Sequence, residues 1–400
     1  MRYPVNNSAF PDVIPMAGRI LLFSDIFPPK TGGSGRWFWE IYSRLPREEV
    51  LIAAGRGAGA EAFDKTHDLK MLRLPIEMRT RGIRSFSNLK HYLKLASMVG
   101  KIVKREKITA IHCARNLPEG FMAYLVQRRR GTKYLCYVHG EDVGVSSTSR
   151  ELAWMTRRVF AGASMVVANS NNTRNMLLKE WNLPEAKVRL LYPGVDTKRF
   201  SPVPASETER AELGWTGRKV LLTVGRLQKR KGHDCLIKAV KTIREKHPDV
   251  LYAILGDGEE LPHLKKLVES EGVADHVQFV GEVTDAILMR CYQQCDLFVL
   301  PNRTIGKDFE GFGMVLLEAQ ACGKPVVAGA SGGTAETMQI PETGRVVNCD
   351  TPEPLAKLLI EMLDNPAELK AMGERGRQWV CDRFDWDALS RQAASLFAEV

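Results

Sequence analysis

The chain has 400 residues, more than the ~100–200 residues of an ordinary domain, so two domains are expected. Its hydrophobic fraction of 44% and charged fraction of 26% are those of a soluble globular protein. The sequence has no apolar run of about 18 residues that would span a membrane, and the polar, proline-rich residues 1–18 do not resemble a signal peptide. We therefore expect a cytoplasmic protein.

The formal net charge of +10 indicates an anionic partner: nucleic acid, a membrane surface or a phosphorylated substrate. Much of the excess lies in residues 79–107, where lysines and arginines alternate with apolar residues. This pattern predicts a basic amphipathic helix, which either covers a sheet with its outer face in solvent or lies on an anionic membrane surface. Nucleic-acid binding is disfavoured because no recognisable module and no interleaved aromatic residues are present.

Apolar strand-like runs alternate with helix-like segments along the whole chain, which predicts parallel sheets covered by helices. The strands expected in the first half are Arg19–Phe27, Val50–Ala54, Ala110–Cys113, Tyr134–His139, Met165–Asn169 and Val188–Tyr192. Those expected in the second half are Val220–Gly225, Leu251–Gly256, Val277–Gly281, Leu297–Leu300, Pro325–Ala328 and Arg345–Asn348. The fold class predicted is α/β, with two Rossmann-like, doubly wound domains.

The proline- and glycine-containing segment Tyr192–Pro202 reads as the linker between the two domains. We expect an N-terminal domain over residues 1–195 and a C-terminal domain over residues 196–385. Residues 386–400 form an amphipathic helix that packs back on the first domain. The eight cysteines form no CxxC pair and lie mostly in apolar runs, so they are expected to be reduced and packed rather than metal-bound or disulfide-linked.

Two glutamates in the second half give the strongest functional signal. Residues 313–322 predict a helix that ends at Gly323, and the helix is apolar almost all round, so it should be buried. Glu318 within it would need a partner, because buried carboxylates persist only when they are paired or hydrogen-bonded. Either the hydroxyl groups of a ribose or a structural salt bridge to an arginine would satisfy it. Glu310 precedes the helix, and glycines 311 and 313 would let the backbone approach a phosphate closely.

A basic turn follows the strand expected at Val220–Gly225. Arg226 and Lys231 are separated by a short stretch that ends in a glycine, and two such cations suit a diphosphate. A basic turn is also commonly just a solvated loop. Its position directly after a strand, near the glutamate motif, favours the diphosphate site.

Three further segments follow predicted strands, where ligands collect in doubly wound sheets. Gly33 lies in a glycine-rich loop that precedes a helix, although the loop matches neither GxGxxG nor a P-loop. His139 ends a predicted strand, where it either contacts a sugar hydroxyl or bonds to a neighbouring loop. Residues 331–336 follow another strand and could close the floor of a site. Trp37 and Phe38 are expected to pack on the sheet, although their faces could instead bind a sugar.

Taken together, these motifs resemble retaining GT-B glycosyltransferases of family 4, also called group 1. The resemblance rests on the paired glutamates, separated by seven residues, and on Gly225-Arg226, Lys231-Gly232, His139-Gly140 and the segment Tyr192–Pro202. It covers nearly the whole chain. The stretch around Arg303 and residues 317–323 looks most like the phosphatidylinositol-mannosyltransferase branch, although the glycine-rich stretch before Glu310 is shortened here.

The resemblance implies two Rossmann-like domains that face a central cleft, and transfer of a hexose from a nucleoside-diphosphate sugar with retention at the anomeric carbon. GDP-mannose is favoured over UDP-sugars as the donor, and the acceptor is a hydroxyl group of a saccharide or of a lipid-linked molecule. No metal and no other cofactor is expected. We expect a cytoplasmic enzyme, and the sequence leaves open whether residues 79–107 associate with the inner face of the membrane or form a solvated helix face.

The family's roles carry over residue by residue. Those expected are Arg226 and Lys231 at the diphosphate, Glu318 at the ribose, Glu310 at the hydroxyls of the donor sugar, His139 near the reaction centre, and backbone groups of Gly33, Phe312, Gly313 and Met314 at phosphate or sugar. Two alternatives remain open. A non-hydrolysing sugar-nucleotide epimerase shares the architecture but has other motifs, and a degenerate sugar-nucleotide-binding protein would lack functional positions that look intact here.

Overall fold

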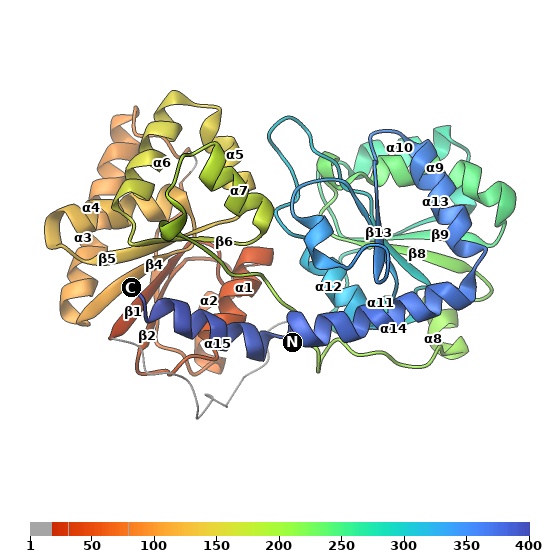
Figure 1. The fold of residues 1–400 in the computed structure, drawn as a ribbon, viewed down its shortest axis with the longest axis horizontal. Coiled ribbons are helices and arrows are strands. Elements are labelled where there is room, and N and C mark those ends of the chain that lie inside the picture. The colour runs from red at the N-terminus through yellow and green to blue at the C-terminus, as the bar shows by residue number, and fades with distance from the viewer. Residues whose placement is uncertain (1–17, 31, 79) are drawn as a thin grey trace. The chain divides into compact units, whose positions relative to one another are not determined.

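The computed structural model describes residues 18–30, 32–78 and 80–400. Most of the polar N-terminal stretch and Arg79 of the basic segment lie outside these residues. The chain divides into two compact units, one that ends at Pro193 and includes Trp386–Val400, and one that spans Gly194–Asp385. The boundary predicted after residue 195 therefore differs by two residues from the observed one. In each unit helices cover both faces of a sheet (Figure 1).

The first unit contains a parallel sheet of seven strands in the order β3-β2-β1-β4-β5-β6-β7. Its strands are β1 (Arg19–Ser24), β2 (Val50–Gly55), β3 (Met71–Leu74), β4 (Ile108–Cys113), β5 (Lys133–Val138), β6 (Met165–Ala168) and β7 (Val188–Leu190). Its helices are α1 (Gly33–Tyr42), α2 (Ala60–Thr66), α3 (Phe86–Arg105), α4 (Phe121–Arg130), α5 (Glu141–Ser147), α6 (Arg150–Gly162), α7 (Asn171–Lys179) and α15 (Trp386–Phe397).

The second unit contains a parallel sheet of six strands in the order β10-β9-β8-β11-β12-β13. Its strands are β8 (Lys219–Val224), β9 (Val250–Leu255), β10 (Val277–Gly281), β11 (Leu297–Leu300), β12 (Val326–Gly329) and β13 (Gly344–Val347). Its helices are α8 (Glu207–Glu212), α9 (His233–Lys246), α10 (Leu261–Ser270), α11 (Asp285–Gln294), α12 (Met314–Ala321), α13 (Pro352–Leu363) and α14 (Pro366–Arg383).

All twelve strands predicted from the sequence are present, because strands buried on both faces of a parallel sheet read as continuous apolar runs. Strand β3 was not predicted from the sequence. This strand has four residues, lies at the edge of its sheet and is fully buried only at Leu74, so it lacks the apolar run of the inner strands. In each sheet the strand order reverses beside the first strand of the unit, between β1 and β4 and between β8 and β11. The carboxyl ends of these strands are where ligands bind in such folds.

The C-terminal helix α15 packs on α1 within the first unit. The rings of Tyr42 and Phe397 stack with their centroids 5.6 Å apart, and Arg44 Nε donates to Asp387 Oδ1 at 3.0 Å. Burial of an aromatic pair and a partly buried ion pair stabilise this docking.

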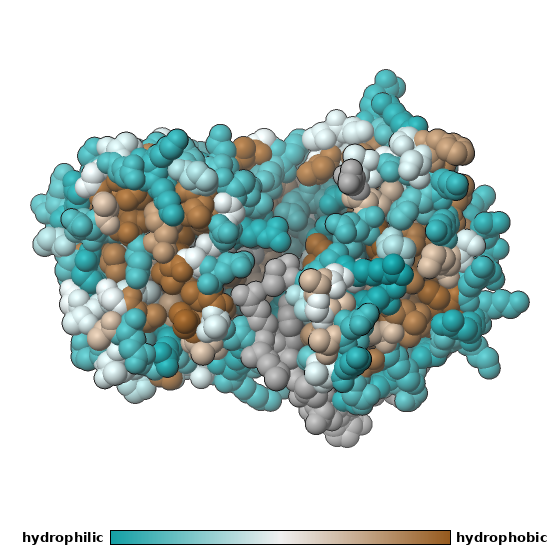
Figure 2. Space-filling model, turned by 180° about the vertical axis from the view of Figure 1, so that it is seen from behind, coloured by the Kyte–Doolittle hydropathy of each residue, from teal (hydrophilic) through white to brown (hydrophobic). Residues whose placement is uncertain are grey.

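The eight cysteines are free thiols, and seven of them are buried, as predicted. Among the described residues, no helix combines the length and the apolar content needed to cross a membrane. On the face seen in Figure 2, hydrophobic residues form separate groups among hydrophilic ones.

Candidate functional site

The basic turn predicted after the first strand of the second unit begins at Gly225, directly after β8. Residues Lys229–Lys231 form one short helical turn, and Gly232 then opens α9 with a φ of +73°. A Cβ atom at Gly232 would lie 1.7 Å from the carbonyl oxygen of Pro301, which follows β11. Only glycine allows this approach, and it brings the loops that follow β8 and β11 together at the edge where the strand order reverses.

Two cations of the loop after β8 meet Glu310 of the loop after β11. Its Oε2 accepts hydrogen bonds from Lys231 Nζ and from an Arg230 guanidinium nitrogen, each at 2.6 Å. Arg230 also forms an ion pair with Asp308 at 3.1 Å. The side chains of Arg230, Lys231 and Glu310 are 11–13% exposed, so this cluster is largely buried.

Burial raises the pKa of Glu310, but the charges of Lys231 and Arg230 outweigh it and hold that pKa below its usual value. Glu310 is therefore an ionised acceptor at neutral pH, held next to two cations. The structure brings together two predicted site residues, Lys231 and Glu310, that are far apart in the sequence. Arg226, the other predicted cation, is exposed at the start of the turn.

Arg230 was not predicted from the sequence to be a site residue. The basic turn that contains Lys231 also contains Arg230, so the sequence indicated a cation at this position. Three consecutive cations at 229–231 do not show, however, which of the side chains point inward. In the structure Lys229 is exposed, whereas Arg230 and Lys231 face the carboxylate of Glu310.

The loop that follows β12 supports the backbone of Glu310. Gly333 donates its N–H to the carbonyl oxygen of Glu310 at 3.1 Å. A Cβ atom at Gly332, where φ is +60°, would lie 1.8 Å from the same oxygen. The hydroxyl groups of Thr304 and Ser331 lie 2.9 Å apart and join this loop to the one after β11. The segment that the sequence suggested as the floor of a site therefore packs directly beneath Glu310.

Helix α12 begins after Gly313, whose φ is +96°, and runs to Ala321, close to the predicted helix. The first N–H groups of a helix have no partner within it, so Gly313 and Met314 present backbone donors at this end. The side chain of Phe312 is buried, with its ring centroid 5.9 Å from that of Phe384, so the predicted contact with a ligand would have to come from its backbone.

Glu318 was expected in a helix buried on all sides, and this expectation is wrong for one face. Met314, Val315 and Glu318 lie on a half-buried side of α12, while the remaining sides are packed. The hydroxyl group of the buried Tyr292 donates to Glu318 Oε2 at 2.7 Å. Burial and the neighbouring Glu318 charge raise the pKa of Tyr292 well above its usual value, so the phenol remains a donor. Tyr292 was not predicted from the sequence to be a site residue.

In the first unit, His139 follows β5 and is buried. Its Nε2 donates to the carbonyl oxygen of Ala114 at 2.9 Å, which is the bond to a neighbouring loop that the sequence left open. Burial lowers the pKa of His139, which favours the neutral ring. Trp37 and Phe38 lie edge-on to this ring with centroids 5.5 and 5.9 Å away, and both are buried, so the prediction that they pack on the sheet is confirmed.

Gly33 is exposed at the first position of α1. Glu119, which was not predicted from the sequence, joins the loop that follows β4 to the loop that follows β1. Glu119 is buried, and its Oε1 accepts the backbone N–H of Asp25 at 2.8 Å. Burial raises its pKa above the usual value. Nothing in its sequence neighbourhood marked it, because a glutamate beside a proline and a glycine is ordinary in a surface turn.

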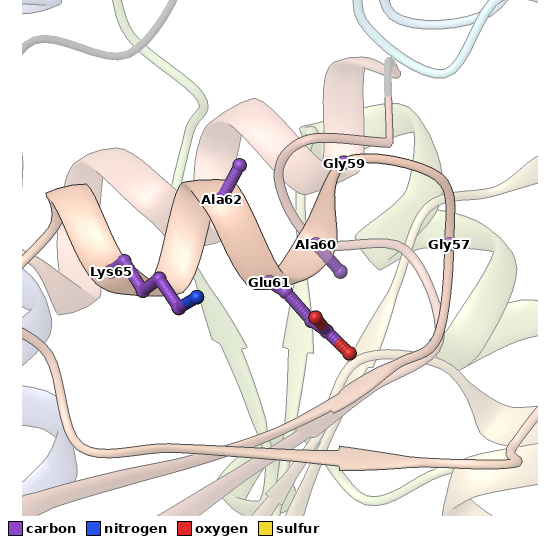
Figure 3. A pocket seen from close by; sticks show the side chains of 6 residues that line it. All are labelled: Gly57, Gly59, Ala60, Glu61, Ala62 and Lys65. Carbon is purple, nitrogen blue, oxygen red and sulfur yellow. The ribbon is translucent and has the colours of Figure 1, made fainter.

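A separate open pocket lies at the start of α2, lined by Gly57, Gly59, Ala60, Glu61, Ala62 and Lys65 (Figure 3). It contains none of the predicted site residues. The helix there has only seven residues, and the pocket offers the two side chains of Glu61 and Lys65 as charged groups.

Comparison with known proteins decides the family. Residues 31–199 match the sequence model described as Glycosyltransferase Family 4, and residues 205–379 match that described as Glycosyl transferases group 1. A protein of Mycobacterium tuberculosis, described as a GDP-mannose-dependent alpha-(1-6)-phosphatidylinositol monomannoside mannosyltransferase, is 32% identical over 389 residues, which covers 94% of this chain and 97% of the relative. The chain belongs to the family 4 glycosyltransferases.

A second relative of this glycosyltransferase comes from Corynebacterium glutamicum. It is described as a GDP-mannose-dependent monoacylated alpha-(1-6)-phosphatidylinositol monomannoside mannosyltransferase and is 30% identical over 387 residues, covering 94% of this chain and 97% of its own length. Among solved structures, HepE of Anabaena in complex with UDP has a TM-score of 0.81 at 19% identity and covers 96% of this chain and 100% of that one. This likeness shows the fold, which is GT-B.

The family assignment excludes the two alternatives that the sequence left open, a non-hydrolysing epimerase and a degenerate sugar-nucleotide-binding protein. It does not test individual residues. The roles predicted from the resemblance for Glu310, Lys231, Arg226 and Glu318, and for His139 and Gly33 in the first unit, remain predictions.

Proposed function

We propose that this glycosyltransferase transfers mannose from GDP-mannose to a hydroxyl group of a lipid-linked acceptor of the phosphatidylinositol mannoside class, with retention at the anomeric carbon. The relatives in Mycobacterium and Corynebacterium, which match over nearly their whole length, support this donor and this acceptor class. The observation that carries the proposal within the chain is the cluster of Lys231, Arg230 and Glu310 at the edge where β8 and β11 end.

The cluster suits the two needs of a nucleotide-sugar donor. The leaving diphosphate gains negative charge as the glycosidic bond breaks, and fixed cations stabilise this charge most where water is largely excluded. Lys231 supplies such a cation in a mostly buried position, and Arg226 offers a second one at the start of the same turn. Glu310, ionised and acceptor-only, is suited to hydroxyl groups of the transferred sugar.

Glu318 is suited to the ribose of the donor. A carboxylate has several acceptor positions, and Tyr292 uses one at Oε2. This acceptor capacity suits the half-buried side chain to the hydroxyl groups of a ribose. Backbone N–H groups at the start of α12, after Gly313, complete an anion-binding end of the site.

We infer a front-face substitution. The bond between the anomeric carbon and the phosphate oxygen breaks, and the bond to the acceptor oxygen forms on the same face of the sugar. The nucleoside diphosphate leaves with the electron pair, and its phosphate oxygen takes the proton of the acceptor hydroxyl. Lys231 and Arg226 take the charge-balancing role that a divalent metal has in other transferases, so we propose that no metal is required.

The test incubates the full chain with radiolabelled GDP-mannose and phosphatidylinositol monomannoside in detergent micelles, with and without EDTA, beside UDP-glucose as a second donor. We expect a mannolipid whose new linkage is α by NMR, with a rate that EDTA changes by less than about twofold, because the fixed cations need no metal. Transfer only from the UDP-sugar would overturn the donor. A β-linked product would overturn retention, and loss of turnover in EDTA that Mg²⁺ restores would overturn metal independence.

A further inference from the structure

The loop that leads to Glu310 contains a tight backbone turn. The N–H of Ile305 donates to the carbonyl oxygen of Asp308 at 2.8 Å, and the N–H of Asp308 donates back to that of Ile305 at 3.0 Å. Gly306 and Lys307 lie between them, and Gly306 has a φ of +62°. These residues belong to the stretch that is shortened here relative to the phosphatidylinositol-mannosyltransferase branch. The short turn places the carboxylate of Asp308 two residues before Glu310.

Arg230 is held between the two carboxylates of this loop. Its Nε forms an ion pair with Asp308 at 3.1 Å, and a second guanidinium nitrogen donates to Glu310 Oε2 at 2.6 Å. Its carbonyl oxygen accepts the N–H of Arg303 at 2.8 Å, and the guanidinium of Arg303 donates to Asp234 on α9 at 2.8 Å. Arg230 is therefore fixed at its main chain and at two edges of its planar guanidinium.

Lys231 is bonded to the same carboxylate in a different way. Its Nζ donates to Glu310 Oε2 at 2.6 Å, the oxygen that Arg230 also uses. A lysine ammonium is a point charge with three donors on a flexible stem, so it can turn toward a second anion without a change in the backbone. A planar guanidinium that bridges two carboxylates has no such freedom. Lys231 is therefore able to turn, whereas Arg230 is fixed.

We propose that Arg230 is a positioning residue, which holds the carboxylate of Glu310 in place while Lys231 turns to the diphosphate of the bound donor. The inference rests on the proposed function, in which Lys231 meets the diphosphate and Glu310 accepts hydroxyl groups of the sugar. A diphosphate beside Lys231 takes up part of its charge and brings negative charge close to Glu310, which favours the protonated carboxyl. Protonation would remove one of the acceptor positions of Glu310. A guanidinium that does not titrate, tied to Asp308, opposes this change.

The charged groups that face Glu310 set its response to pH. Lys231 and Arg230 face it from the turn after β8, and Asp308 faces it from its own loop. The loop after β12 contributes an uncharged group, the backbone N–H of Gly333. Burial raises the pKa of Glu310, and the two cations together lower it below its usual value. Without Arg230, and with Lys231 drawn to a diphosphate, the effect of burial would prevail, and Glu310 would take up a proton at higher pH.

The test compares four variants of the full chain. Arg230→Gln removes the charge and the bonds to both carboxylates, whereas Arg230→Lys keeps the charge and loses the planar fork. Asp308→Asn weakens the hold on Arg230 and removes the titration of Asp308 itself. Lys229→Gln removes the same charge from the exposed neighbouring position and is the matched control. For each variant, kcat and KM for GDP-mannose are measured from pH 5 to pH 9 with phosphatidylinositol monomannoside as acceptor.

We expect Arg230→Gln to lower kcat at pH 7 by about tenfold or more, because a charge-assisted hydrogen bond to Glu310 is lost. The acid limb of its kcat profile should move to higher pH, and KM for the donor should change by less than about threefold. Arg230→Lys should return the acid limb to its wild-type position and recover only part of kcat. Asp308→Asn should lower kcat severalfold without moving the acid limb to higher pH, and Lys229→Gln should stay within about twofold.

The position of the acid limb separates this role from a structural one. An arginine that only supports the fold would, when replaced, reduce the amount of folded enzyme and leave the acid limb in place. A folded Arg230→Gln variant with the wild-type acid limb would overturn the proposal, and so would equal losses of kcat in Arg230→Gln and Lys229→Gln. Arg230→Lys keeps the charge of the cluster and decides the case if Arg230→Gln does not fold, because wild-type kcat in this variant would also overturn the proposal.

A readout without turnover keeps this inference distinct from the proposed function. The ionisation of Glu310 is followed by NMR of the ligand-free protein labelled with ¹³C at the glutamate carboxyl groups, with Glu310→Gln to assign the signal. We expect the carboxyl to take up its proton at higher pH in Arg230→Gln than in the wild type or in Lys229→Gln. This pattern with no transfer from GDP-mannose would overturn the proposed function and leave the role of Arg230 standing. Transfer from GDP-mannose with a titration of Glu310 that Arg230→Gln leaves unchanged would do the reverse.

Discussion

Replacing Lys231 with alanine separates the catalytic role of the cation from its structural role. The Lys231 ammonium lies 2.6 Å from Glu310 Oε2 in a cluster that is 11–13% exposed. If Lys231 stabilises the leaving diphosphate, its loss should lower kcat by about 10²–10³, which corresponds to ~2.7–4 kcal/mol of transition-state stabilisation. A merely structural lysine would leave kcat nearly unchanged in the protein that remains folded.

The effect on folding should be smaller. Breaking a buried ion pair costs about 3–5 kcal/mol when it leaves a charge unpaired. Here Arg230 still donates to Glu310 at 2.6 Å, so the carboxylate keeps a partner. We therefore expect the free energy of unfolding to fall by well under that amount, roughly 1–2 kcal/mol, the value of one charge-assisted hydrogen bond.

The assay measures kcat with saturating GDP-mannose and, separately, the free energy of unfolding in urea. The matched control is Lys229→Ala, an exposed lysine on the same short helical turn, which should keep its rate within about twofold because it faces solvent. A Lys231→Ala variant that folds and retains more than a third of the wild-type rate would refute the reasoning. Equal losses in the two variants would do so as well, because they would indicate a nonspecific effect of charge.

Three further predictions concern residues that support the sites. Tyr292→Phe removes one hydrogen bond to Glu318, so KM for the donor should rise about tenfold with little change in kcat, measured by initial rates. Gly332→Ala places a methyl group against the Glu310 carbonyl at a φ of +60°, and thermal unfolding should show a loss of at least about 1 kcal/mol. Glu119→Gln should raise the Tm at pH 8 and leave it unchanged near pH 4.

The sign for Glu119 follows from its raised pKa. Below the unfolded-state pKa the carboxyl is protonated in both states and has no effect on stability. As the pH rises through the window between the unfolded and the higher folded pKa, the unfolded state loses its proton first, so the wild type loses stability that the neutral glutamine keeps. A Tm difference that is the same at both pH values would contradict this. For Tyr292→Phe, the contradicting result is an unchanged KM, and for Gly332→Ala it is wild-type stability.

The fold was largely predictable because its strands are long apolar runs. Twelve of the thirteen strands in the described part of the chain follow from runs such as that of β2, which is buried at every position. The edge strand β3 was not predictable in this way, since an edge position removes the need for continuous burial. The predicted ends of α12 lie within a residue of the observed ones, and Gly323, where the helix was expected to end, has a φ of +73° that other residues rarely take.

The sequence by itself determined the fold class, the glutamate pair and the basic turn, because each is encoded in residues that are neighbours along the chain. Only the tertiary structure decided which cations meet Glu310 and which phenol donates to Glu318. These contacts join residues 26 to 80 positions apart, and the choice of partner depends on which strand ends lie side by side. The local sequence does not encode which partner each side chain contacts, because the side chains of one turn take different directions only once the turn is folded and packed.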